Sequence, residues 1–205
     1  APSILIRFDE PGGATTVSDT SQPHSPYGGY CTAPSCPVTG HSAQMGNAAL
    51  FDGVDDHFSL GTVPEISALT NDFFVSAWVM PARVTGRQRI VGLSRDTRAD
   101  GFGFGLVDDG LVLTFYGVED FIAPAMGIAV DEWTWVAASA ERVVAPGSGD
   151  VSTRVHFFAV QLEGGASAGT DKVVTSAADG ALPDLGEALM IGAVHATNAS
   201  PGMTP

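Results

Sequence analysis

Three aspartates within five residues form the densest group of side chains in this sequence that could do chemistry. Asp52, Asp55 and Asp56 lie in ALFDGVDDHFSLG, residues 49–61, between two short apolar runs. Clustered carboxylates suit calcium, which binds about six to eight oxygens from carboxylates and carbonyl groups in loops. The same residues are typical of a tight turn, because Asp52-Gly53 favours a turn and the neighbouring acids can accept hydrogen bonds from local amides. The sequence leaves both interpretations open.

Catalytic carboxylates would have to share one face of a strand. Glycoside hydrolysis needs two acids at i and i+2 or i and i+4, which places the carboxyl groups about 5 Å apart in a retaining enzyme. The predicted strands offer no such pair, since the nearest acids lie at strand ends or in loops: Glu10, Asp131, Glu132 and Glu141. A serine-hydrolase elbow, a His-Glu-x-x-His helix and a phosphate loop are also absent from the sequence. We therefore expect a protein that is not an enzyme, with a glycoside hydrolase as the least favoured alternative.

The two cysteines, Cys31 and Cys36, lie in GGYCTAPSCPVTG. Their short spacing among Gly, Pro and Ser favours a local disulfide, formed in an oxidising compartment. His24 and His41 flank the loop and leave zinc open, although this Cys-x4-Cys arrangement is not a recognised zinc spacing. A disulfide would tie down residues 9–46, where no apolar periodicity is found, and it predicts an extracellular or cell-surface protein.

The charge of the chain excludes several partners. A net charge of −14, with Lys172 as the only lysine, would repel nucleic acids and anionic membrane surfaces. No apolar run is long enough to cross a membrane. The opening APSILIRFDE has no leader and predicts a mature protein or a domain of a longer one. Asn198 begins an Asn-Ala-Ser glycosylation acceptor pattern.

Short apolar runs recur along the chain, separated by Gly, Asp, Pro and Ser, and helical periodicity is nearly absent. In LVDDGLVL, Asp109-Gly110 predicts a tight hairpin turn. Strands joined by such turns predict an all-β antiparallel sandwich or barrel, formed as a single domain over residues 1–205. The predicted strands are residues 3–8, 48–51, 57–60, 73–80, 88–94, 101–107, 111–116, 133–141, 154–162, 171–175 and 188–192.

A series of motifs covers nearly the whole chain: IRFDEPGGATTVSDTS, GNAALFDGVDDHFSLG, NDFFVSAWVMP, RIVGLS, GFGFGLVDDGLVLTFYG, DEWTWVAAS, VHFFAVQLEG and ALMIGA. Their order resembles that of laminin-G-like domains in the concanavalin A-like lectin/glucanase superfamily. The resemblance implies a jelly-roll sandwich of two curved antiparallel sheets. It also implies a lectin-like recognition or adhesion module, and many members bind calcium at the rim of the sandwich.

Two departures from the family pattern affect the prediction. Family domains commonly end with a strand like F-x-G-x-I-D-x-V beside the first strand, whereas this sequence ends in HATNASPGMTP. Either the sequence is part of a longer chain or another segment takes that place. An open sheet edge would suit a structural subunit of a fibre or surface layer, completed by a neighbouring subunit's strand. The other departure is Trp135, at a position where the family often has histidine.

Aromatic side chains are the main candidates for binding sugar, because carbohydrate-binding modules present them on sheet faces or in rim loops. Motif position predicts that Phe74, Trp78, Phe104 and Trp133 belong to the core. The predicted carbohydrate-binding residues are Tyr30, Tyr116, Trp135 and His195, although Trp135 shares a strand face with Trp133 and could also be core. The leading prediction is a non-catalytic extracellular module that binds glycan or an extracellular protein, with self-association through an open edge as the alternative.

Overall fold

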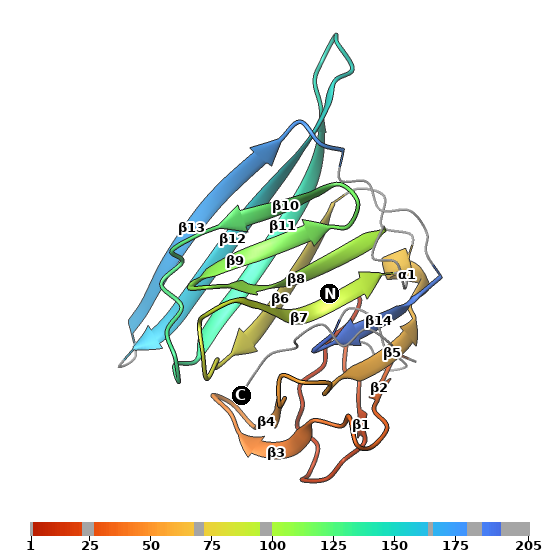
Figure 1. The fold of residues 1–205 in the computed structure, drawn as a ribbon, viewed down its shortest axis with the longest axis vertical. Coiled ribbons are helices and arrows are strands. Elements are labelled where there is room, and N and C mark those ends of the chain that lie inside the picture. The colour runs from red at the N-terminus through yellow and green to blue at the C-terminus, as the bar shows by residue number, and fades with distance from the viewer. Residues whose placement is uncertain are drawn as a thin grey trace.

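The computed structural model describes residues 2–21, 27–67, 72–94, 100–163, 166–179 and 186–193. This part of the chain is almost entirely β-structure, with one short helix (Figure 1). The elements are β1 (Thr16–Val17), β2 (Gly29–Tyr30), β3 (Val38–Ser42), β4 (Asn47–Leu50), β5 (Phe58–Thr62), α1 (Pro64–Ser67), β6 (Phe73–Val79), β7 (Arg87–Ser94), β8 (Gly101–Val107), β9 (Gly110–Phe115), β10 (Glu119–Ala123), β11 (Thr134–Val144), β12 (Val151–Glu163), β13 (Ala166–Ser176) and β14 (Ala188–Ile191). None of its helices is long and apolar enough to span a membrane.

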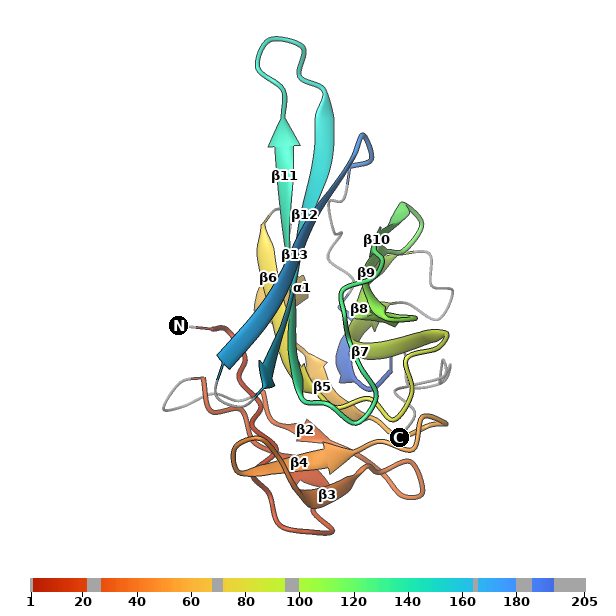
Figure 2. The same cartoon turned by 90° about the vertical axis from the view of Figure 1, so that its left-hand side faces the viewer.

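Two antiparallel sheets enclose the main core. The eight-stranded sheet has the order β1-β2-β5-β14-β7-β8-β9-β10, the four-stranded sheet has the order β13-β12-β11-β6, and β3 and β4 form a separate hairpin. Figure 2 shows the four-stranded sheet on one side of the molecule and β7–β10 on the other. Side chains from both sheets, such as Phe104 and Phe157, are fully buried in one cluster between them. The antiparallel sandwich predicted from the sequence is confirmed.

Strand β8 shows why the sequence folds this way. In GFGFGLV the large residues Phe102, Phe104 and Leu106 alternate with glycine and all point into the core. The predicted β8–β9 hairpin is present, but Val107 pairs with Gly110, so the turn is formed by Asp108 and Asp109 rather than Asp109-Gly110. Asp108 supplies the positive φ, at 49°.

Several predicted strands need correction. Residues 3–8 form no strand; the β-pairing within this segment is an isolated bridge between Ile6 and Asp19. The predicted strand 171–175 is part of the longer β13, which pairs with β12 along its whole length. The sequence analysis missed β1, β2, β3 and β10, the first three of which lie within the loop region predicted at 9–46.

The predicted core position is wrong for two aromatic residues on β6. Phe73, Val75 and Ala77 pack against the core, and strand alternation turns the residues between them to the opposite side. Phe74 is therefore 57% exposed and Trp78 37% exposed. The predicted core position is confirmed for Phe104, which is fully buried. Trp133, which was predicted to belong to the core as well, is only half-buried.

The β11–β12 hairpin extends well beyond the other strands (Figure 1). Its turn is closed by hydrogen bonds from Ala145 N to Asp150 O (2.8 Å) and from Gly149 N to Ala145 O (3.1 Å). Residues 146–150 are exposed, and Gly147 and Gly149 have positive φ angles of 92° and 75°. The tip of this hairpin therefore lies away from the core.

Candidate functional site

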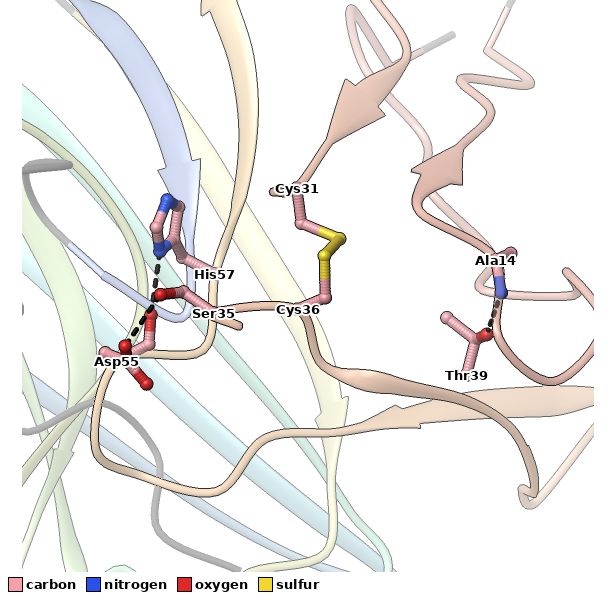
Figure 3. The surroundings of a disulfide bond; sticks show 7 residues. All are labelled: Ala14, Cys31, Ser35, Cys36, Thr39, Asp55 and His57. Carbon is pink, nitrogen blue, oxygen red and sulfur yellow. Dashed lines mark hydrogen bonds between the residues drawn. A yellow bond between two sulfur atoms is a disulfide. The ribbon is translucent and has the colours of Figure 1, made fainter. Parts of the chain in front are cut away.

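The predicted disulfide is present between Cys31 and Cys36 (Figure 3). It joins the chain just after β2 to the loop before β3, and this loop also contacts the turn before β5. Ser35 Oγ donates to Asp55 Oδ2 (2.6 Å), and the His57 amide donates to Ser35 O (3.3 Å). A disulfide indicates an oxidising environment, and this one holds Ser35 against the aspartates.

The three aspartates form a hydrogen-bonded turn between β4 and β5. Asp52 Oδ1 accepts hydrogen bonds from the amides of Val54 (2.8 Å), Asp55 (3.3 Å) and Asp56 (3.4 Å). In return, Asp56 Oδ2 accepts one from the Asp52 amide (2.8 Å). The turn interpretation of this cluster is therefore realised in the structure.

The same turn could hold a metal ion. One ligand atom from each of Asp52, Asp55 and Asp56 lies within 4.8 Å of the others. The hydrogen bonds described above use one oxygen of each carboxylate. The amide hydrogen bond from Val54 lowers the pKa of Asp52, whereas burial raises the pKa of Asp56 above its ordinary value. A bound cation would relieve the cost of burying the Asp56 charge.

Strand β14 packs tightly against this turn. Gly192, just after β14, has a φ of +83°, and a Cβ atom there would lie 2.6 Å from the Phe51 ring and 2.8 Å from Asp56 O. Phe51 packs edge-on against Phe58 in a second, smaller core (ring centroids 6.3 Å apart). The aspartate turn is thus held in place by packing as well as by hydrogen bonds.

A second candidate site lies on the outer face, the side of the four-stranded sheet that points away from the core. Register places Phe74 beside Ser139 and Trp78 beside Trp135 on β6 and β11. Cross-strand partners share one face of a sheet. The remaining outer-face residues follow from the pairing of β11, β12 and β13: Ser76, Ala137, Glu141, Val143, Ser152, Arg154, His156, Phe158, Val160, Gly169, Asp171, Val173 and Thr175.

Aromatic rings cover part of the outer face. The rings of Phe74 and Trp135 lie 6.3 Å apart and are inclined by 32°. Trp78 extends this group as the direct cross-strand neighbour of Trp135. Beside them, His156 and Phe158 lie with ring centroids 4.5 Å apart. We refer to Phe74, Trp78 and Trp135 as the aromatic platform.

A polar hollow adjoins the aromatic platform. It has a volume of about 170 Å³ and is lined by Ser139, Glu141, Arg154 and His156. Arg154 forms an ion pair with Glu141 across the two strands, and His156 Nε2 lies 3.2 Å from Asp171 Oδ2. The hollow therefore offers hydroxyl, carboxylate, guanidinium and imidazole groups on rigid strands.

The structure does not bring the predicted carbohydrate-binding residues together. Trp135 belongs to the four-stranded sheet. Tyr30 (54% exposed) belongs to the eight-stranded sheet, and Tyr116 lies in the turn between β9 and β10 of that sheet. His195 lies outside the described residues. Sequence analysis missed the polar hollow, although the alternation Arg154-x-His156 in a strand was a signal that two polar side chains share one face.

Tyr116 belongs to a network around a buried arginine. Its ring lies 5.6 Å from the guanidinium of Arg89, which is 4% exposed. Arg89 donates to Gly103 O (3.0 Å) and Thr114 Oγ1 (2.9 Å). Thr114 in turn donates to Asp120, which also receives a hydrogen bond from Arg87 (2.7 Å). These contacts make the network a structural feature of the sheet.

Asp120 stays ionised in this network. Burial alone would raise the pKa of Asp120, but hydrogen bonds from Arg87 and Thr114, together with the charges of Arg87 and Arg89, lower it below its ordinary value.

A comparison of the sequence with protein-family models and with characterised proteins finds no match to either.

Proposed function

We propose that this protein is a non-catalytic extracellular recognition module that binds glycans on the outer face of the four-stranded sheet. The observation that carries the proposal is the aromatic platform, where Phe74 and Trp78 are 57% and 37% exposed beside the half-buried Trp135. Exposed aromatic rings on a rigid surface are characteristic of binding sites. The resemblance to laminin-G-like domains supports the same function.

The environment of the outer-face acids favours binding over catalysis. Glu141 is paired with Arg154, and Asp171 faces His156. Glycoside hydrolysis needs two carboxyl groups that can both reach the sugar, whereas Glu141 is engaged in an ion pair with Arg154. The disulfide, by indicating an oxidising environment, supports an extracellular location.

A glycan array probed with the purified protein, with and without EDTA, tests this function. We expect binding to one family of glycans, lost when Trp135 is replaced by alanine. Absence of binding to any glycan under both conditions would count against glycan recognition and favour a protein partner or a structural role.

Calcium at the aspartate turn belongs to this proposal as its cofactor, because a cluster of carboxylate oxygens suits a hard cation. Addition of CaCl₂ should raise the melting temperature, and EDTA should reverse the change. The double variant D52N/D56N keeps an acceptor for each hydrogen bond but removes two charges. It should fold and lose the calcium response; a wild-type melting temperature that is insensitive to calcium would exclude the site.

The edge of β6 supports one alternative, a structural subunit completed by a neighbouring strand. Among the described residues, β6 pairs only with β11, and its core-facing Phe73, Val75 and Ala77 are only partly buried. A strand added at this edge would cover them. Light scattering over a range of concentrations separates the two functions, since a subunit of this kind should assemble into long particles and a recognition module should not.

A further inference from the structure

If the protein binds glycans, as proposed above, the outer face also indicates which chemical class of glycan it binds. We infer that the outer face binds a chain of neutral sugars, with one ring against Phe74 and Trp135 and hydroxyl groups of the same or the next sugar in the polar hollow. Ser139 links the two parts, since it pairs with Phe74 in register and lines the hollow.

The aromatic platform suits the apolar side of a sugar ring. A pyranose presents several C–H groups on one face, and the negative face of an aromatic ring attracts them. The rings of Phe74 and Trp135 lie 6.3 Å apart at only 32° to each other, so both can contact one extended ligand. The two rings come from adjacent strands, which fixes their spacing before any ligand binds.

The polar hollow suits hydroxyl groups. A sugar hydroxyl both donates and accepts, and the hollow supplies acceptors on Glu141, donors on Arg154, and a group of each kind on Ser139. The ion pair between Arg154 and Glu141 holds these groups in place. Neighbouring hydroxyls of one sugar can therefore bond to the carboxylate and the guanidinium together.

Charge favours a neutral ligand over an anionic one. The guanidinium of Arg154 is already balanced by Glu141, and Asp171 adds a further negative charge beside His156. The net charge of −14 of the whole chain would also repel sulfated or uronic-acid-rich polymers. A sugar without charge meets none of this repulsion.

The test is titration calorimetry with neutral oligosaccharides, using the best neutral hit of the array, beside sulfated and uronic-acid oligosaccharides of equal length. We expect only the neutral ligand to bind, with an affinity unaffected by salt. Phe74→Ala and Ser139→Ala should each weaken binding about tenfold. The matched controls Val118→Ala, an exposed apolar residue near the other sheet, and Ser152→Ala, on the same face of β12, should bind like the wild type.

The outcomes separate this inference from the function on which it rests. Preference for a sulfated or uronic-acid ligand, or neutral binding unchanged in both Phe74→Ala and Ser139→Ala, would overturn the inference and leave glycan recognition standing. Failure of the wild type to bind any glycan would overturn both. Thermal unfolding of each variant shows whether a loss of binding reflects a loss of fold.

Discussion

At the scale of single residues, Thr114 holds the buried Arg89 in place. Its hydroxyl accepts hydrogen bonds from Arg87 (3.1 Å) and Arg89 (2.9 Å) and donates one to Asp120. One oxygen thus connects strands β7, β9 and β10. Because Arg89 is 4% exposed, its hydrogen bonds cannot be replaced easily by water.

We expect Thr114→Val to destabilise the protein by about 1–3 kcal/mol, since the side chain keeps its shape but leaves a buried N–H of Arg89 without its acceptor. Urea unfolding measures the change. Thr175→Val, an exposed threonine on β13, is the matched control and should change stability little. Equal stability of Thr114→Val and the wild type would show that the network contributes nothing.

Asp120 gives the stability a predictable pH dependence. Its pKa is lower in the folded protein than its ordinary value of 3.8. The ionised carboxylate therefore contributes stability that is complete above pH 3.8 and is lost as the pH falls through the lower folded pKa. Asp120→Asn should lower the free energy of unfolding at pH 6 and make little difference at the lowest pH. The free energy of unfolding is measured by urea unfolding at each pH. A difference between Asp120→Asn and the wild type that is the same at every pH would contradict this account.

At the scale of elements, packing between strands decides what the sequence alone leaves open. Strand β8 was predicted correctly because glycine alternates with Phe102 and Phe104, which marks the core face. Strand β6 is apolar on both faces, so its sequence does not show which residues point inward. Only the pairing with β11 places Phe74 and Trp78 on the outer face.

The aspartate turn and the polar hollow also differ in how far the sequence alone predicts them. The aspartate turn could be predicted because its residues are neighbours in the sequence and bond to one another. The polar hollow could not, because Ser139 and Glu141 come from β11 while Arg154 and His156 come from β12. The register of two long strands brings them together, and register depends on the whole sheet.

The junction between β14 and the aspartate turn gives a prediction for two glycines. Gly192→Ala should destabilise the protein by at least about 2 kcal/mol, because φ is +83° and the new methyl group would overlap Phe51 and Asp56 O. Gly147→Ala is the control, since φ is +92° but no atom lies within 4 Å. Thermal unfolding should show a clearly larger loss for Gly192→Ala; equal losses would mean that the close packing has no effect.

At the scale of the whole molecule, the charge of −14 opposes folding, because like charges repel more strongly in the compact state. Salt should therefore stabilise the protein, as the Debye length falls from about 30 Å at 0.01 M to about 8 Å at 0.15 M. We expect the melting temperature to rise over this range at pH 7. Near the isoelectric point of about 4.4 the rise should disappear; a rise of the same size at both pH values would point to another cause.

The projecting β11–β12 hairpin makes the molecule easy to attach to a surface. The hydrogen bonds at its exposed tip, around Ser148, join residues of the turn to one another, so an inserted tag there has no core residue to displace. A protein immobilised by this tip would present the outer face along its length rather than pressed against the support. The β11–β12 hairpin, which lengthens the four-stranded sheet, thus provides an attachment point for single-molecule and sensor measurements of binding.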